Sequence, residues 1–191
     1  MKSEKSRTGG PVRSYFSELD RKVTMAVRHV HGSTRTRLAH AVTFLGSHAF
    51  LIPAAILASG VLLIAGWRSS ARFLGFSMLV GSALSPLLKR RFRRGRPDLW
   101  TPLATEPTHS FPSGHATMGS IFFGALGIVF WRELPGAAAR TGTVLFCSAM
   151  ILLVALSREY LGAHWLSNVL AGILLAAVWL AILFASRLTE P

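Results

Sequence analysis

The chain has 191 residues, 51% of them hydrophobic, and a mean hydropathy of +0.44. This length fits one domain, and the composition is typical of a membrane protein, because a soluble helical protein would need more amphipathic helices to cover its apolar runs. The net charge of +13 raises nucleic acid as a partner. The cations flank the apolar runs, however, as membrane topology and lipid headgroups favour, so we expect no nucleic acid.

The N-terminal part of the chain is basic and lacks a long apolar run. Residues 1–13 have the composition of a disordered segment and contain no apolar core of a cleavable signal peptide. Within residues 14–47, Val23 and Val27 alternate with basic residues, which predicts an amphipathic helix on the membrane surface and a connection to the first span. Four histidines in or near this part are expected to pack or to lie at the interface. They are His29, His31, His40 and His48.

Several apolar runs approach the length of about 20 residues that crosses a hydrocarbon core of about 30 Å. The runs cover residues 51–67, 74–88, 116–131, 143–156 and 165–184. We therefore expect an all-α integral membrane bundle of about five helices, with a transmembrane domain over residues 48–187 and a tail over 188–191. A sixth crossing near residues 23–44 is the alternative, although the arginines within it make it costly. Trp179, in the middle of the last run, is expected to pack between helices.

Three short motifs follow one another in the second half of the chain. They are Lys89-x6-Arg96-Pro97, Pro112-Ser113-Gly114-His115 and Ser157-Arg158-x5-His164-x3-Asn168. If the spans alternate in direction, the loops that carry these motifs fall on the same side of the membrane.

Cleavage of a phosphate ester requires groups that offset the negative charge of the phosphate, an in-line nucleophile and a proton for the leaving oxygen. The residues of these motifs can supply all three. Lys89, Arg96 and Arg158 lie at the ends of apolar runs, where long cationic side chains can bind phosphate oxygens. Ser113 and Gly114 precede the run that starts at residue 116. We therefore place them at a helix N-terminus, which favours an anion, and capping of the helix by Ser113 is compatible with that role.

Together the motifs resemble those of the type-2 phosphatidic acid phosphatase superfamily, which includes membrane lipid phosphatases, bacterial acid phosphatases and vanadium haloperoxidases. The resemblance implies that His164 is the nucleophile, which forms a phosphohistidine, and that His115 is the general acid. It also implies the groups that hold the phosphoryl oxygens. These are Lys89, Arg96, Ser113, the Gly114 amide and Arg158.

The small, mostly apolar chain fits the membrane lipid phosphatase branch, because it leaves no room for the large soluble domain of a haloperoxidase. The eight acidic residues are scattered along the sequence. We therefore expect no metal and no other cofactor.

Asn168 departs from the family pattern, which usually has aspartate at this position. It lies four residues after His164 and so on the same helical face, where an aspartate would accept the second imidazole N–H and stabilise positive charge on the ring. Asparagine can accept that hydrogen bond but carries no charge. Three alternatives follow: a slower phosphatase, a replacement carboxylate such as Glu159 or Asp98, or a protein that binds lipid phosphates without hydrolysing them. We favour retained activity, because both histidines and all three cations are present.

The expected function is that of a multi-pass cell-membrane enzyme that hydrolyses a lipid phosphomonoester or diphosphate. Candidate substrates are a polyprenyl phosphate or diphosphate, phosphatidate and phosphatidylglycerophosphate, and the expected partners are this substrate and the membrane lipids. A lipid phosphotransferase with the same intermediate is the alternative. Most of the 21 lysines and arginines lie on the side of the site, which favours the cytoplasm, whereas the resemblance implies an outward-facing site.

Overall fold

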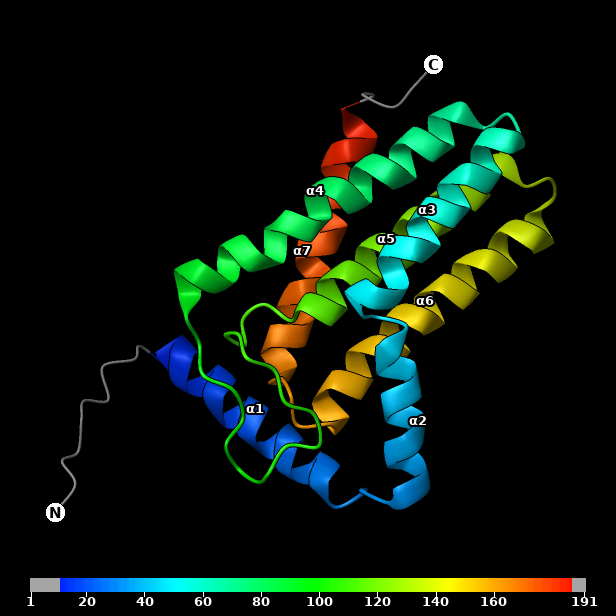
Figure 1. Cartoon of the computed structure of the whole chain (residues 1–191). Helices are drawn as coiled ribbons and strands as arrows, with labels where there is room; N and C mark the ends of the chain where they lie inside the picture. The colour runs from blue at the N-terminus through cyan, green and yellow to red at the C-terminus, as the bar shows by residue number, and fades with distance from the viewer. Residues whose placement is uncertain (1–10, 187–191) are drawn as a thin grey trace, which may run out of the picture.

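The computed structural model describes residues 11–186, and within this range the chain forms seven helices and no strand. The helices are α1 (Pro11–Arg28), α2 (Ser33–Phe44), α3 (His48–Ile64), α4 (Arg68–Phe92), α5 (Gly114–Glu133), α6 (Ala137–Tyr160) and α7 (Leu166–Ala185). Figure 1 shows α3 to α7 as a bundle, with α1 across one end of it. The expected all-α fold is confirmed.

Four helices, α4 to α7, are each long and apolar enough to cross a membrane. Helices α2 and α3 pass the same test as a pair, which is bent by 47° at its break, so the described chain has up to five spans. The expectation of about five helices agrees with this count. No single helix covers residues 23–44, where a sixth crossing was the alternative, because the chain turns at residues 29–32, between α1 and α2.

The apolar runs mark the middle of the spans but not their ends. Helix α4 extends past its run to Phe92, and α6 extends past its run to Tyr160. These additional turns carry Lys89 and Arg158, so both cations are presented by helices and not by loops. Helix α5 begins close to its run, because the Ser113 hydroxyl caps it by accepting a hydrogen bond from the Ala116 N–H.

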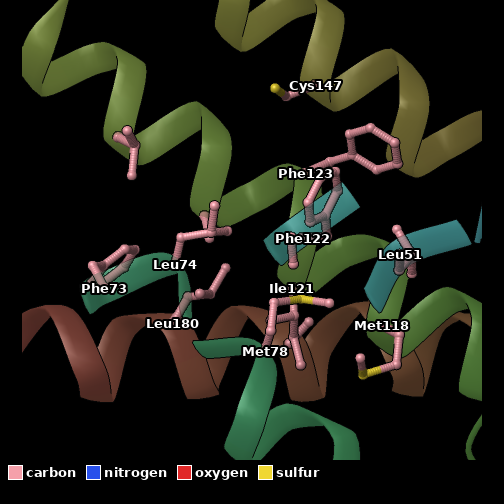
Figure 2. Close-up of a cluster of buried hydrophobic side chains, with 14 of the residues drawn as sticks. Leu51, Phe73, Leu74, Met78, Met118, Ile121, Phe122, Phe123, Cys147 and Leu180 are labelled. Atoms are coloured by element: carbon pink, nitrogen blue, oxygen red, sulfur yellow. The ribbon is translucent and has the colours of Figure 1, made fainter. Parts of the chain in front are cut away.

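A continuous apolar core joins the spans, and α5 lies at its centre, packed against α3, α4, α6 and α7. Figure 2 shows Phe73 and Leu74 of α4 in one cluster with Ile121 and Phe122 of α5 and Leu180 of α7. All five side chains are buried. Because lipid tails are as apolar as these side chains, close packing and not exclusion from water holds such helices together.

Contacts between α4 and its neighbours show how close this packing is. A Cβ atom added at Gly81 would lie 2.5 Å from Ile121 Cδ1, so only glycine fits there without a shift. Trp179 of α7 packs against α4 as expected, since its Nε1 donates to the Ser77 carbonyl at 3.1 Å and its ring lies 6.2 Å from that of Phe76.

The outer faces of the spans are also apolar. Large exposed side chains there include Ile56, Leu57, Ile64, Leu79 and Leu145. A water-soluble protein rarely exposes so many, whereas a lipid bilayer covers them. This surface argues against the soluble alternative.

Helix α1 presents a polar face to the bundle. Asp20 and Thr24, one turn apart, are buried, and the Thr24 hydroxyl donates to a Glu159 carboxylate oxygen of α6 at 2.5 Å. The sequence reasoning considered only the valine face of this helix. Residues 1–10 of the segment expected to be disordered, and the tail over 188–191, lie outside the described residues, while residues 11–13 belong to α1.

Candidate functional site

The three motifs meet at one end of the bundle. There the C-terminal ends of α4 and α6 lie with the N-terminal ends of α5 and α7, and the connection from α4 to α5 runs across the same end (Figure 1). A cavity of about 670 Å³ opens at this end between α3, α4, the connection from α4 to α5 and the first turn of α5. Its lining includes His48, Lys89, Arg96, Glu106, His109, Gly114 and His115.

Lys89 and Arg96 line this cavity from α4 and from the segment that follows it. The Lys89 ammonium donates to the Thr108 hydroxyl at 2.9 Å. The Arg96 guanidinium donates to the Thr108 carbonyl at 2.8 Å and to the Ala163 carbonyl at 2.6 Å. Burial lowers the pKa of Arg96, but a guanidinium is too strong a base to lose its proton for this reason. The loop thus fixes both cations against the wall of the cavity.

Arg158 is the third cation, and it is buried at the end of α6. Its Nη1 donates to the Thr43 hydroxyl of α2 at 2.8 Å, and its Nη2 pairs with the Glu106 carboxylate. Glu106 also lies 3.7 Å from Arg96 Nη2. One carboxylate therefore sits between two of the three predicted phosphate-binding cations.

The N-terminus of α5 lies beside Lys89. Ser113 is its N-cap, and a Cβ atom added at Gly114 would lie 3.8 Å from Lys89 Nζ. Free backbone N–H groups at a helix N-terminus favour an anion. The Ser113 and Gly114 positions therefore combine with Lys89 in an arrangement that suits phosphate oxygens.

His164 is fully buried and is held in one tautomer by two neighbours. Its Nδ1 lies 2.8 Å from the Ser110 carbonyl, which can only accept, and its Nε2 lies 3.2 Å from Arg96 Nη1, which can only donate. The ring proton therefore belongs on Nδ1, and the lone pair belongs on Nε2. Burial lowers the pKa of His164 well below its usual value, and the nearby Arg96 and Arg158 charges lower it further. Both effects favour the neutral imidazole.

His115, in the first turn of α5, contacts the same carboxylate as the cations do. Its Nδ1 lies 3.4 Å from a Glu106 oxygen. A carboxylate in this position can accept a hydrogen bond from the facing ring nitrogen. His115 lines the cavity, whereas His164 reaches it only past Arg96.

Asn168 does not orient His164 by the hydrogen bond that was expected. Its Oδ1 accepts from Arg94 Nη1 at 2.6 Å, and the Ser110 carbonyl takes the place of the expected acceptor at the ring. Neither suggested replacement carboxylate does so either. Glu159 is bonded to Thr24, and Asp98 has no hydrogen bond to His164 among the described residues.

Sequence reasoning missed several residues of the site. Glu106 is the one acidic residue between Asp98 and Glu133. Its place between two motifs rich in predicted phosphate-binding groups was a usable signal, because a carboxylate there can pair with their cations. Nothing in the motif spacing pointed to the Ser110 carbonyl. His48 and His109, to which no catalytic role was given, both line the cavity. His31, by contrast, packs as expected, with its Nε2 2.9 Å from the Tyr160 carbonyl.

Among the described residues, no group of three or more histidine, cysteine or acidic side chains is arranged to hold a metal ion. The chemistry that this end of the bundle offers is a set of three cations, a helix N-terminus and two imidazoles, one of which directs its Nε2 lone pair at Arg96.

The chain is similar to proteins of known activity. The family model described as PAP2 superfamily matches residues 70–190. Phosphatidylglycerophosphatase B of Bacillus subtilis is 30% identical over 134 residues, which are 69% of this chain and 64% of that protein. A lipid A 1-phosphatase of Rhizobium johnstonii is 31% identical over 171 residues, which are 78% of this chain and 66% of that protein. The chain thus spans slightly less than two thirds of the length of these curated relatives.

Two solved structures share the fold. A transmembrane PAP2 type phosphatidylglycerolphosphate phosphatase from Bacillus subtilis superposes with a TM-score of 0.84 at 22% identity, over 96% of this chain and 90% of that one. Aquifex aeolicus LpxE superposes with a TM-score of 0.69 at 20% identity, over 87% of this chain and 95% of that one. The family model covers more than half of the chain and includes all three motifs, so the chain belongs to the PAP2 superfamily.

Proposed function

We propose that this protein is a membrane phosphatase that hydrolyses a lipid phosphate through a phosphohistidine on His164, without a metal. The observation that carries the proposal is the convergence of three cations, the α5 N-terminus and two histidines at one end of helices that are apolar enough to span a membrane. A phosphate group in the cavity would meet Lys89, Arg96, the α5 N-terminus and His115 directly, with His164 behind Arg96 and Arg158 behind Glu106.

The proposed reaction has two steps. In the first, the Nε2 lone pair of His164 attacks phosphorus, the bond from phosphorus to the lipid oxygen breaks, and His115 donates a proton to that oxygen. In the second, His115 takes a proton from water, the water oxygen attacks phosphorus, and the bond from phosphorus to nitrogen breaks to release inorganic phosphate. Lys89, Arg96 and Arg158 offset the negative charge in both steps.

Glu106 has two parts in this proposal. Its contact with His115 favours the protonated ring that the first step consumes. Its contacts with Arg158 and Arg96 involve the cations that would bind phosphate, so the substrate competes with this carboxylate for them. When the substrate phosphate pairs with these cations in place of Glu106, the carboxylate would shift toward His115.

The place for the lipid tail lies between α3 and α4. An apolar groove of about 520 Å³ there is lined by Ile52 of α3 and by Leu79 and Ser82 of α4. The polar cavity is lined by His48 and Ser85 on the same two helices, one turn away. A lipid whose tail lies in the groove would therefore present its phosphate to the cations.

The named relatives act on phosphatidylglycerophosphate or on lipid A. For this chain we propose the broader class of lipid phosphomonoesters and diphosphates, which includes polyprenyl phosphates, phosphatidate and phosphatidylglycerophosphate. The alternative of binding without hydrolysis rests on Asn168. The alternative of phosphoryl transfer would use the same intermediate with an alcohol in place of water.

The test is a panel of lipid phosphates assayed for inorganic phosphate release in detergent with EDTA, using wild type and His164→Ala. We expect release by wild type in EDTA and none by the variant. Release that EDTA abolishes, or that the variant retains, would contradict the mechanism. Binding of a lipid phosphate without release of inorganic phosphate would support the alternative of a non-catalytic binding protein. Transfer of the phosphoryl group to an added alcohol in preference to water would support the alternative of a phosphotransferase.

A further inference from the structure

A carboxylate from outside the family match is built into the wall behind the catalytic histidine. Asp20 of α1 is 2% exposed and accepts three hydrogen bonds from two residues. Its Oδ1 accepts from the Ser167 N–H at 2.8 Å, and its Oδ2 accepts from the Ser167 hydroxyl at 2.6 Å and from Arg94 Nη2 at 2.6 Å. Because Ser167 is in the first turn of α7, Asp20 also places negative charge at the N-terminus of that helix. Asp20 thus joins α1, α7 and the segment after α4.

Arg94 carries this connection to the residues around His164. Its Nη1 donates to Asn168 Oδ1 at 2.6 Å. Its own carbonyl accepts from the Ser110 N–H at 3.0 Å and from the Ser110 hydroxyl at 3.1 Å. The Ser110 carbonyl in turn accepts from His164 Nδ1 and so sets the tautomer of the ring. One arginine therefore holds both Asn168 and the residue that orients the nucleophile.

We infer that Asp20 is a positioning residue for His164. Asp20 supplies, through Arg94, the carboxylate that position 168 lacks. The inference rests on the proposed phosphatase function. Asp20 neutralises Arg94, which would otherwise bring an unpaired cation to the wall behind the imidazole. It also fixes the guanidinium that holds Asn168 and, through the Arg94 backbone, Ser110.

The geometry explains how the family position can be occupied by asparagine. Arg94 Nη1 needs an acceptor at position 168, and an amide oxygen is sufficient, because the charge of the guanidinium is already balanced at Nη2. An aspartate at position 168 would put two carboxylates on one guanidinium, which is only partly exposed. In this chain the carboxylate thus lies on α1 and the amide on α7, with Arg94 between them.

The test moves the carboxylate from one position to the other. We expect Asp20→Asn to lower kcat about tenfold to a hundredfold with little change in KM, which is the usual range when a partner of a catalytic group is lost. Asn168→Asp alone should lower kcat about threefold, because it crowds two carboxylates around Arg94. In the double variant Asp20→Asn with Asn168→Asp, one carboxylate again faces Arg94, and kcat should return to within about threefold of wild type.

Thr24→Val is the matched control. Thr24 lies on the same buried face of α1, one turn from Asp20, and its hydroxyl bonds Glu159 and not the Arg94 cluster. A loss of kcat in Thr24→Val as large as that in Asp20→Asn would assign the effect to the docking of α1 and overturn the inference. A double variant no better than Asp20→Asn would overturn it too, as would a large gain in Asn168→Asp alone.

The thermal unfolding midpoint of each variant shows whether it is folded. If wild type releases phosphate and Asp20→Asn matches it in kcat, only the positioning role fails. If wild type releases no phosphate from any lipid of the panel, the proposed function fails, and the positioning role fails with it.

Discussion

At the scale of single residues, the proposed chemistry depends on which nitrogen of His164 carries the lone pair. The Ser110 carbonyl at Nδ1 and the Arg96 guanidinium at Nε2 leave the lone pair on Nε2, on the side of the cations. The motif spacing predicted His164 and its cations, because those side chains act through their own functional groups. It could not predict Ser110, which acts through its backbone carbonyl and for which any residue type would supply the same atom.

The protonation state of His164 leads to a prediction on pH. A nucleophile must be neutral, and burial together with Arg96 and Arg158 lowers the pKa of this ring well below the ordinary value. The ring should therefore stay neutral, and activity should persist, as the pH falls below the usual imidazole pKa of about 6.5. The measurement is kcat/KM against pH for wild type, corrected for the second ionisation of the lipid phosphate itself. An acid limb that remains at about 6.5 or above after this correction would show that His164 is not held neutral in this way.

Glu106 gives a second prediction at this scale. If it favours a proton on His115, its removal should matter most when the leaving oxygen needs that proton. We expect Glu106→Gln to lower kcat about tenfold or more for a lipid alcohol as leaving group, but to have a much smaller effect for p-nitrophenyl phosphate, whose leaving group is a weak base. His115→Ala should show the same pattern, more strongly. Equal losses with both substrates would mean that Glu106 serves the cations and not the acid.

At the scale of elements, the site depends on how closely α5 and α7 approach. A Cβ atom at Gly172 would lie 2.9 Å from Thr117 Oγ1, 3.0 Å from the Ser113 carbonyl and 3.1 Å from the Thr117 N–H. Two of these three atoms are backbone atoms in the first turn of α5 or at its cap. This turn also carries Gly114 and His115, so the spacing of two helices sets the position of catalytic groups.

We expect Gly172→Ala to move the first turn of α5 away from α7. The cost should be about 1–3 kcal/mol of stability, because backbone atoms cannot yield as a flexible side chain does, and phosphate release should fall with it. Gly142→Ala is the control, since nothing lies within 4 Å of a Cβ atom at that exposed position of α6. That change should leave activity intact and raise helix stability slightly. Similar thermal midpoints and activities for the two variants would refute the argument.

The elements were predictable from the sequence to different degrees. The apolar runs located α4 to α7, because a bilayer imposes a length and a composition on each span. The docking of α1 was not predictable from its valine pattern, since Asp20 and Thr24 are placed by tertiary partners far along the chain: Arg94 and Ser167 for Asp20, and Glu159 for Thr24. Asp20 is buried and so requires a partner, but the sequence alone does not show that burial.

At the scale of the whole molecule, the fold places the site and α1 at one end and the α3–α4 and α5–α6 turns at the other (Figure 1). The prediction that both site loops share a side follows from alternating spans and agrees with this arrangement. Net charge could not have located the site by itself, because the cations around the cavity belong to a larger set that extends over α1 and α2.

Cysteine labelling tests this arrangement in intact cells. In a Cys147→Ala background, single cysteines at Leu19 or Thr105 should react with a membrane-impermeant reagent from one side of the membrane. Cysteines at Ala65 or Ala138, which are exposed at the opposite end, should react only from the other side. Labelling of the cysteines at positions 19 and 105 from different sides would contradict this arrangement. If they are labelled from the same side, that side is the compartment that the site faces.

The account as a whole depends on the covalent step at His164. The most direct measurement mixes the protein with a lipid phosphate labelled with ³²P, stops the reaction in alkali within a few turnovers, and looks for label on the protein. We predict label that is stable to alkali and labile to acid, located on the peptide that contains His164 and absent from His164→Ala. Wild type that releases phosphate without ever carrying the label, or a His164→Ala variant that still releases it, would contradict the account.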